Sequence, residues 1–219
     1  MKKSLFPIFA TAGLLLSCSN LKTLPAPETI DGYWSMFNID KHINVFGTLD
    51  DYLFRDDIVY RDMRMLVDPA QYEQIGGDRF LSGFVDGFSV TPYPYIAPVY
   101  GLPPEVGSSY GGPHLFDYDG QSTYTANYAE SQAILLELFP QDKTIFVMCG
   151  GGGYAMMMKN MLVSLGWDAD KIYNVGCYWS YSGDHDIKIK EGEGDEAVYH
   201  FHRVDYKVID LSYLTPLDA

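Results

Sequence analysis

The segment "KTIFVMCGGGGYAMMMKNMLVSLGW", from Lys143 to Trp167, carries the pattern that decides the fold. Its run of β-branched and aromatic residues ends at Cys149 and predicts a buried strand. Four glycines follow, and then a Met-rich amphipathic stretch ends at Gly166, as a helix with a glycine C-cap does. The sequence therefore places a thiol at the head of a glycine loop, between a strand and a helix.

Segments of strand and helix character alternate around this one, from about Ile58 to Trp179. Strands are expected at residues 58–64, 83–94, 143–149 and 171–179, and helices at residues 66–75, 127–140 and 154–166. This alternation predicts an α/β fold with a mostly parallel central sheet flanked by helices. Ligands of such sheets bind beyond the carboxyl ends of the strands, where Cys149 and the Gly176-Cys177 turn are both expected.

The N-terminus has the pattern of an export signal. A cationic "MKK" precedes an apolar stretch that ends in "LLSC" at Cys18, which resembles a bacterial lipobox whose cysteine is lipidated. The apolar stretch is too short to span a bilayer as a helix. We expect a lipoprotein signal peptide at residues 1–18, a Pro-rich tether at 19–34 and a single domain at 35–219. The protein would then be lipid-anchored in the cell envelope, with its domain outside the cytoplasm. The alternative is a plain secretory signal with a chance cysteine.

The net charge limits the classes of binding partner, and the cysteine count limits the possible disulfides. The formal net charge of −14 argues against nucleic acid and anionic lipid headgroups as partners, and the membrane is expected as a partner only through the lipid anchor. A strongly anionic substrate would need a local positive site. With Cys18 lipidated, Cys149 and Cys177 remain, either as one disulfide or as two free thiols.

Residues 93–124 interrupt the alternation with a long stretch rich in Pro, Gly and Tyr. It has no clear period, and loops of this length in compact domains often serve as lids or rims of sites. A surface excursion packed by its own tyrosines is the alternative interpretation.

The glycine loop favours thiol chemistry. Successive glycines let the backbone curl, so that several N–H groups of the loop and the helix dipole point at one spot. Cys149 over such a nest is expected to have a lowered pKa and to act as a thiolate nucleophile. The alternative is a packing turn beside a buried apolar cysteine. A P-loop is excluded, because no Lys and Ser or Thr follow the glycines.

Three stretches resemble a rhodanese-like domain. "IVYRDMRMLVDPAQYEQIGGDRFLSGFVDGFSVTP" is similar to the N-terminal half of that family, with a strand that ends in Asp-x-Arg at Asp62 and Arg64. The segment from Lys143 to Trp167 resembles the active-site strand, its Cys-headed loop and the following helix. "KIYNVGCYW" is similar to the last strand, and residues 93–124 would be an insertion.

The resemblance implies sulfane-sulfur transfer. Cys149 would be the nucleophile that carries sulfur as a persulfide, cradled by the N–H groups of Gly150, Gly151, Gly152 and Gly153. Asp62 and Arg64 would form a structural ion pair. The expected partners are a small sulfur donor and a thiol acceptor, and no cofactor or metal is implied.

Two positions depart from the family pattern. Tyr154 stands where the family usually has an arginine, and a neutral hydroxyl suits neither thiosulfate nor the phosphate of a Cys-dependent phosphatase. Cys177 stands where a glycine usually follows Gly176. It is a candidate resolving thiol that would form a reversible disulfide with Cys149, while a free or permanently bonded pair is the alternative. The two functional hypotheses are a sulfurtransferase and a non-catalytic binding module.

Two histidine-containing motifs are weaker. His200 and His202 lie on one face of an expected strand, and two surface histidines explain them better than a metal site. Asp184, His185 and Asp186 are interpreted as a polar loop.

Overall fold

The computed structural model describes residues 22–64, 83–102, 110–188, 190–192, 194–199 and 210–217. The elements in chain order are η1 (Tyr33–Phe37), η2 (Leu49–Tyr52), β1 (Ile58–Asp62), β2 (Gly83–Val85), β3 (Ser89–Val90), α1 (Tyr93–Ile96), β4 (Phe116–Tyr118), β5 (Tyr124–Ala126), α2 (Ser131–Leu138), β6 (Thr144–Cys149), α3 (Gly153–Ser164), η5 (Ala169–Lys171), β7 (Ile172–Cys177), η6 (Tyr178–Ser180), β8 (Asp186–Lys188), β9 (Lys190–Glu191), η7 (Gly194–Glu196), β10 (Val198–Tyr199) and η8 (Leu211–Tyr213). The signal peptide with Cys18, the helix expected at residues 66–75, and His200 and His202 lie outside the described residues.

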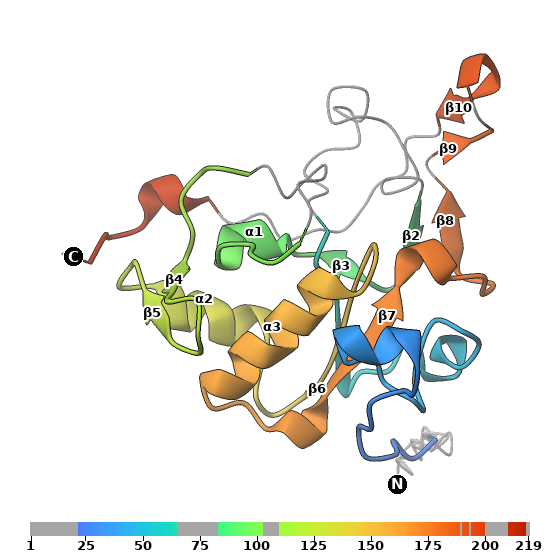
Figure 1. Ribbon diagram of the computed structural model, residues 1–219, viewed down its shortest axis with the longest axis horizontal. Helices are drawn as coiled ribbons and strands as arrows, with labels where there is room; N and C mark the ends of the chain where they lie inside the picture. The colour runs from blue at the N-terminus through green and yellow to red at the C-terminus, as the bar shows by residue number, and fades with distance from the viewer. Residues whose placement is uncertain are drawn as a thin grey trace, which may run out of the picture.

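The centre of the fold is a four-stranded sheet in the order β3-β1-β6-β7, with every neighbouring pair parallel. The predicted α/β class with a mostly parallel central sheet is therefore confirmed. An isolated parallel bridge between Ile39 and Asn174 continues the pairing beyond β7. Because the strands are parallel, the carboxyl ends at Asp62, Cys149 and Cys177 meet at one edge of the sheet (Figure 1).

Two apolar layers cover the sheet. One contains α2, α3 and α1, and the other contains the N-terminal segment with η2. Figure 1 shows the helices on one side of β6 and β7 and the N-terminal segment on the other. Side chains of β6 alternate between the layers, with Ile145 and Val147 in the helical layer and Phe146 and Met148 in the N-terminal layer. This alternation is the period of two that an extended strand imposes.

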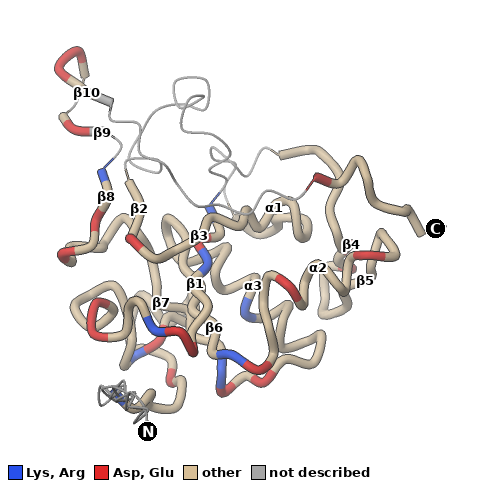
Figure 2. Tube along the Cα trace, turned by 180° about the vertical axis from the view of Figure 1, so that it is seen from behind, with Lys and Arg blue, Asp and Glu red and all other residues tan. Residues whose placement is uncertain are grey.

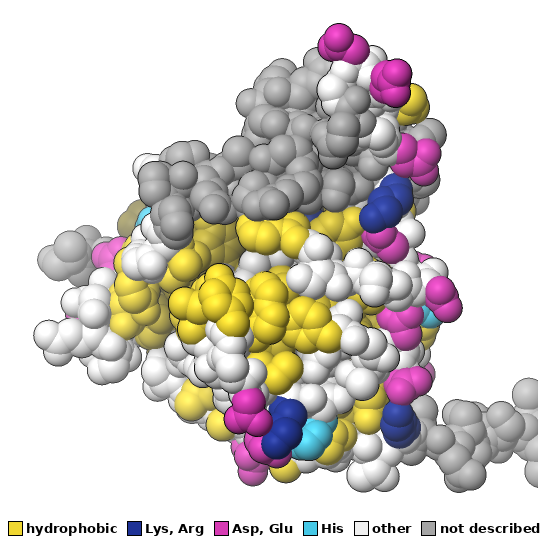
Figure 3. All heavy atoms as spheres, turned by 45° about the vertical axis from the view of Figure 1, so that its right-hand side comes forward, with side chains coloured by type: hydrophobic (Ala, Val, Ile, Leu, Met, Phe, Trp, Pro, Cys, Tyr) yellow, Lys and Arg dark blue, Asp and Glu magenta, His cyan; other side chains and the backbone are white. Residues whose placement is uncertain are grey.

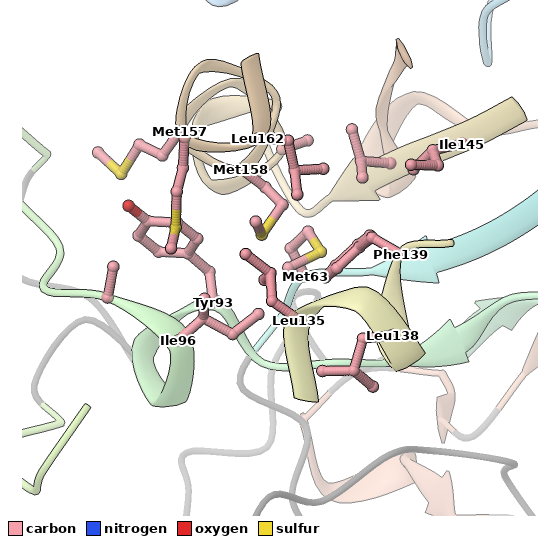
Figure 4. Close-up of a cluster of buried hydrophobic side chains, with 14 of the residues drawn as sticks. Met63, Tyr93, Ile96, Leu135, Leu138, Phe139, Ile145, Met157, Met158 and Leu162 are labelled. Carbon is pink, nitrogen blue, oxygen red and sulfur yellow. The ribbon is translucent and has the colours of Figure 1, made fainter. Parts of the chain in front are cut away.

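The Met-rich stretch forms α3, as predicted, and ends before Gly166, whose φ of 100° is left-handed. Met158 and Leu162 point from α3 toward Met63 and α2 in the core, and Met157 lies on the side of Tyr93 (Figure 4). Methionine side chains are flexible and fill irregular gaps, which suits a layer where a helix meets an irregular insertion.

The described part of the predicted tether, residues 22–34, packs against the domain. Leu24, Ile30 and Trp34 contact the N-terminal apolar layer. The Tyr173 hydroxyl donates to the Pro25 carbonyl at 2.6 Å, and the Ile30 amide donates to the Ile39 carbonyl at 2.8 Å. A Pro-rich composition disfavours regular hydrogen-bonded structure, but it leaves apolar side chains free to pack.

The insertion at residues 93–124 also packs where it is described. It contributes α1 and the strand β4, whose partner in a hairpin is β5, and its buried members Ile96, Leu115 and Phe116 belong to the helical layer. Rings of Tyr100 and Tyr118 stack at 4.5 Å. The described residues of the insertion therefore form a surface excursion packed by its own tyrosines. Residues 103–109 lie outside the described part.

Figure 2 marks Asp and Glu at scattered positions along the described chain, with fewer Lys and Arg positions between them. Among the described residues, no helix is long and apolar enough to cross a membrane.

Candidate functional site

Cys149 is the last residue of β6 and stands at the entrance to the glycine loop. Its Sγ accepts a hydrogen bond of 3.1 Å from the Gly152 amide, and 3 % of the residue is exposed. Gly152 has a φ of +94°, a left-handed conformation that glycine adopts without strain. The loop therefore curls back so that backbone N–H groups face the sulfur, just before α3 begins at Gly153.

The glycines on the sheet side of the loop make room for Trp179. A Cβ on Gly150 would lie 2.6 Å from the Trp179 indole, and one on Gly151 would lie 2.9 Å from it. The Trp179 amide also donates to the Gly150 carbonyl at 3.3 Å. Only glycine at these two positions permits this close approach of the indole.

The other two glycines have different neighbours. A Cβ on Gly153 would lie 2.9 Å from Leu102, and one on Gly152 would lie 3.2 Å from Phe37. At all four positions a neighbouring side chain packs where a Cβ would lie, so packing alone explains why each is glycine. This favours the packing-turn interpretation and is compatible with the thiol site.

The acid–base state of Cys149 differs from the expectation. Burial raises its pKa to about 11, although the N–H groups of Ala155, Gly152 and Tyr154 act to lower it. The negative charge of Asp62 acts in the same direction as burial, and the pKa of about 11 is the net result. The predicted thiolate is therefore wrong for this buried loop, because the loss of hydration outweighs the N–H donors, and the resting group is a neutral thiol.

Asp62 and Arg64 form a buried ion pair at the end of β1. The Arg64 Nη2 lies 2.6 Å from Asp62 Oδ2 and 2.8 Å from the Gly83 carbonyl. The guanidinium also lies over the Tyr178 ring at 4.2 Å. This one side chain therefore connects the end of β1 to β2 and to the turn that follows β7.

Cys177 is paired in register with Cys149, but the two thiols lie in different layers. The β6–β7 register shifts at Val147 and Met148, with Val175 as the extra residue of β7. Cys149 consequently belongs to the helical layer and Cys177 to the N-terminal layer, where its Sγ contacts Ser180 Oγ at 3.5 Å. Both cysteines are free. A disulfide with Cys177 as resolving thiol would require a rearrangement of the strand ends.

Tyr154 lies in the first turn of α3 and is half-buried. Its ring stacks on Tyr93 of the insertion, with centroids 6.0 Å apart. The position where an arginine was expected thus joins the loop to the insertion through an aromatic contact.

Sequence reasoning missed Asn174, a fully buried residue of β7. Its Nδ2 donates to the Phe37 carbonyl at 2.7 Å and to the Gly152 carbonyl at 3.2 Å, so it holds the loop against η1. An amide side chain within the apolar run "IYNVGC", residues 172–177, was the available signal. Trp179 was missed as well, and its signal was a tryptophan two residues after Cys177.

Of the remaining candidates, the structure describes Asp184, His185 and Asp186. Asp186 accepts a hydrogen bond of 2.8 Å from the Tyr178 hydroxyl, and His185 contacts the Phe54 ring. The described part of the chain holds no group of three or more His, Cys, Asp or Glu residues arranged for a metal ion.

Comparisons of the chain with protein-family models, with curated proteins and with solved structures found no match.

Proposed function

We propose that the chain is an exported, lipid-anchored protein with a rhodanese-like domain, which carries sulfane sulfur as a persulfide on Cys149. The observation that carries the proposal is the 3.1 Å hydrogen bond from the Gly152 amide to the Cys149 sulfur, at the junction of β6 and α3. This geometry offers backbone N–H groups to a sulfur anion without a basic side chain.

The arrangement of the sheet supports the resemblance. The strand that ends in Asp62 lies beside the Cys149 strand, and the strand that ends in Cys177 lies on the other side. The elements that resemble the family thus meet at one sheet edge, although the sequence separates them.

The reaction has two balanced steps. In the first, Cys149–SH and a persulfide donor R–S–SH give Cys149–S–SH and R–SH. The S–S bond of the donor breaks, a new S–S bond forms at Cys149, and the thiol proton leaves with R–SH. In the second step Cys149–S–SH and an acceptor R′–SH give Cys149–SH and R′–S–SH, and the two steps together involve no net oxidation.

A binding module is the second candidate. It is favoured by the burial of Cys149 and by the packing neighbours of all four glycines, which account for the loop without catalysis. The two candidates differ in whether sulfur is transferred to Cys149.

The test is sulfur loading followed by intact-mass spectrometry. The reduced protein is exposed to an organic persulfide, R–S–SH, and we expect a gain of one sulfur atom that a thiol acceptor then removes. The Cys177→Ser variant should load like the parent protein, and the Cys149→Ser variant should not load. A parent protein that gains no sulfur would favour the binding module.

Lipid anchoring is tested separately. In a bacterial host, the parent protein should fractionate with membranes and the Cys18→Ser variant should not. Equal fractionation of the two would contradict lipidation at Cys18.

A further inference from the structure

We propose that an exposed aromatic face beside the glycine loop is the docking surface for a partner protein whose own contact surface has an apolar centre and a rim of Lys and Arg. The face is recognised by its composition, its exposure and the charges around it. Its docking role goes beyond the proposed function and does not require sulfur transfer at Cys149.

The aromatic face is built from three segments of the chain. Its members are large apolar side chains of η1, of the loop before η2 and of η6, namely Tyr33, Trp34, Met36, Phe37, Phe46 and Trp179. The ring centroid of Trp34 lies 5.0 Å from that of Tyr33 and 5.4 Å from that of Phe46. The centroid of the Phe37 ring lies 6.5 Å from that of Trp34. Ring contacts therefore join η1 to the loop that carries Phe46.

The glycine loop joins this group to Trp179. A Cβ on Gly152 would lie 3.2 Å from Phe37, and a Cβ on Gly151 would lie 2.9 Å from the Trp179 indole. Because the two glycines are neighbours in the chain, Phe37 and Trp179 pack against the same turn of backbone. Figure 3 shows apolar side chains gathered in the middle of this side of the molecule.

The face is exposed to an extent that core packing does not explain. The exposed fractions are 70 % for Tyr33, 58 % for Met36, 40 % for Phe46 and 37 % for Trp179. Single exposed apolar residues are ordinary, whereas a contiguous group of them marks an interaction surface. Aromatic residues and methionine are also the types enriched in the centres of protein interfaces. The sequence of η1, "YWSMF", contains no charged residue.

The nearest charges are acidic and are not balanced. The two lysines within residues 22–54 form ion pairs with Glu28 and with Asp51. Asp31, which precedes η1, is exposed and forms no ion pair with another described residue. This edge of the aromatic face therefore keeps a negative charge.

A second acidic edge lies at η2, which follows Phe46. The Asp50 carboxylate accepts hydrogen bonds of 2.6 Å from the Tyr181 hydroxyl and 2.9 Å from the Asp184 amide. Both donors are neutral, so they leave the charge of Asp50 in place, and the exposed Asp184 side chain adds another. Acidic side chains are visible along the rim of the apolar group in Figure 3.

These charges decide which partner fits the aromatic face. A second copy of the chain would bring two acidic rims together, and anionic lipid headgroups would be repelled in the same way. A rim of Lys and Arg on another protein would instead meet Asp31 and Asp50 with complementary potential. The apolar centre of that protein would cover the aromatic rings and remove them from water.

The experiment uses the full chain and two synthetic amphipathic peptides. One peptide combines Leu with Lys, and the matched control has Glu in place of every Lys. Binding is measured by fluorescence anisotropy of the labelled peptide and by protection of tryptophan fluorescence from acrylamide, since Trp34 and Trp179 lie in the aromatic face and Trp167 is buried. The Lys peptide should bind and protect, and the Glu peptide should bind at least about tenfold more weakly.

Variants locate the bound peptide. Tyr33→Ser combined with Met36→Ser changes exposed side chains only and should weaken binding of the Lys peptide about tenfold. Phe46→Ser should act in the same direction. The control Tyr213→Ser removes a ring that is 85 % exposed outside the aromatic face and should change the affinity less than about twofold. Asp31→Asn should reduce the salt dependence of binding.

Equal affinities for the two peptides, or an unchanged affinity in both the Tyr33/Met36 and the Phe46 variants, would overturn the proposal. Sedimentation and vesicle binding test the other occupants. A dimer of the parent chain that the Tyr33/Met36 variant abolishes would assign the face to a second copy. Binding to phosphatidylcholine vesicles that the same variant abolishes would assign it to a membrane, and either result would overturn the proposal. None of these measurements depends on a persulfide at Cys149.

Discussion

The carboxyl ends of β6 and β7 differ sharply although both end in cysteine and lie side by side. After Cys149 the chain curls through a left-handed Gly152 into a twelve-residue helix, and a backbone N–H group donates to the sulfur. After Cys177 it enters a three-residue turn, and the sulfur contacts a serine hydroxyl. The chemistry of each thiol is therefore set by the backbone that follows it rather than by the strand that precedes it.

A single extra residue in β7 places the two thiols on opposite faces of the sheet. Val175 shifts the register, so that partners at the strand ends face opposite layers. Because side chains of a strand alternate between faces, one inserted residue is enough to do so.

The largest expected effect concerns Arg64, whose side chain connects the end of β1 to β2 and to the turn that follows β7. Arg64→Ala should lower the free energy of unfolding by about 3–5 kcal/mol, because it leaves the Asp62 carboxylate buried without its partner. Urea denaturation measures the change. Lys41→Ala, which breaks the exposed pair with Glu28, is the control and should cost less than about 1 kcal/mol. Similar losses in the two variants would contradict a large contribution of the buried Asp62–Arg64 pair to stability.

The second effect is the pH dependence contributed by Cys149. Its pKa is raised from 9.0 to about 11 in the folded state, so the folded protein holds the proton more tightly than the unfolded chain. The resulting stabilisation is complete below about pH 9 and is lost as the pH rises to about 11, a loss on the order of 3 kcal/mol.

Chemical denaturation between pH 8 and about 11 checks this dependence, since Cys149→Ser lacks the titrating thiol. The parent protein should lose its stability advantage over that variant across the interval. A constant difference between the two would contradict the buried, neutral thiol.

The third effect tests the contact between the loop and the turn after β7. Gly150→Ala should cost about 1–3 kcal/mol, because its Cβ would lie 2.6 Å from the Trp179 indole. Gly111→Ala, whose Cβ would meet nothing within 4 Å, is the control. In a Trp179→Ala background the cost of Gly150→Ala should fall below about 1 kcal/mol, and an unchanged cost would place the strain elsewhere.

The smallest effect concerns Cys177. Labelling of the denatured, unreduced protein should modify Cys149 and Cys177 separately, since both are free. Cys177→Ser should leave the alkylation rate of Cys149 unchanged within about twofold, because the thiols lie in separate layers. A peptide in which the two cysteines are linked would contradict this arrangement.

The sequence predicted the elements whose patterns are local. The apolar run ending at Cys149, the Met-rich helix and its glycine stop all follow from periodicity within one segment. The parallel sheet followed from the alternation of strands and helices.

The remaining features depend on contacts between distant segments. The bulge at Val175, the loop contact of Asn174 and the indole of Trp179 on the glycines join residues that no local pattern relates. The pKa of Cys149 was mispredicted for the same reason, because the loop suggested N–H donors but not how completely the surrounding layers would exclude water.

The most direct test of the central claim is peptide-resolved mass spectrometry after exposure of the reduced protein to an organic persulfide. We predict that one additional sulfur is found on the peptide containing Cys149, that the peptide containing Cys177 carries none, and that a thiol acceptor removes the added sulfur. Sulfur on Cys177 alone, or on neither cysteine, would contradict the assignment of Cys149 as the sulfur carrier.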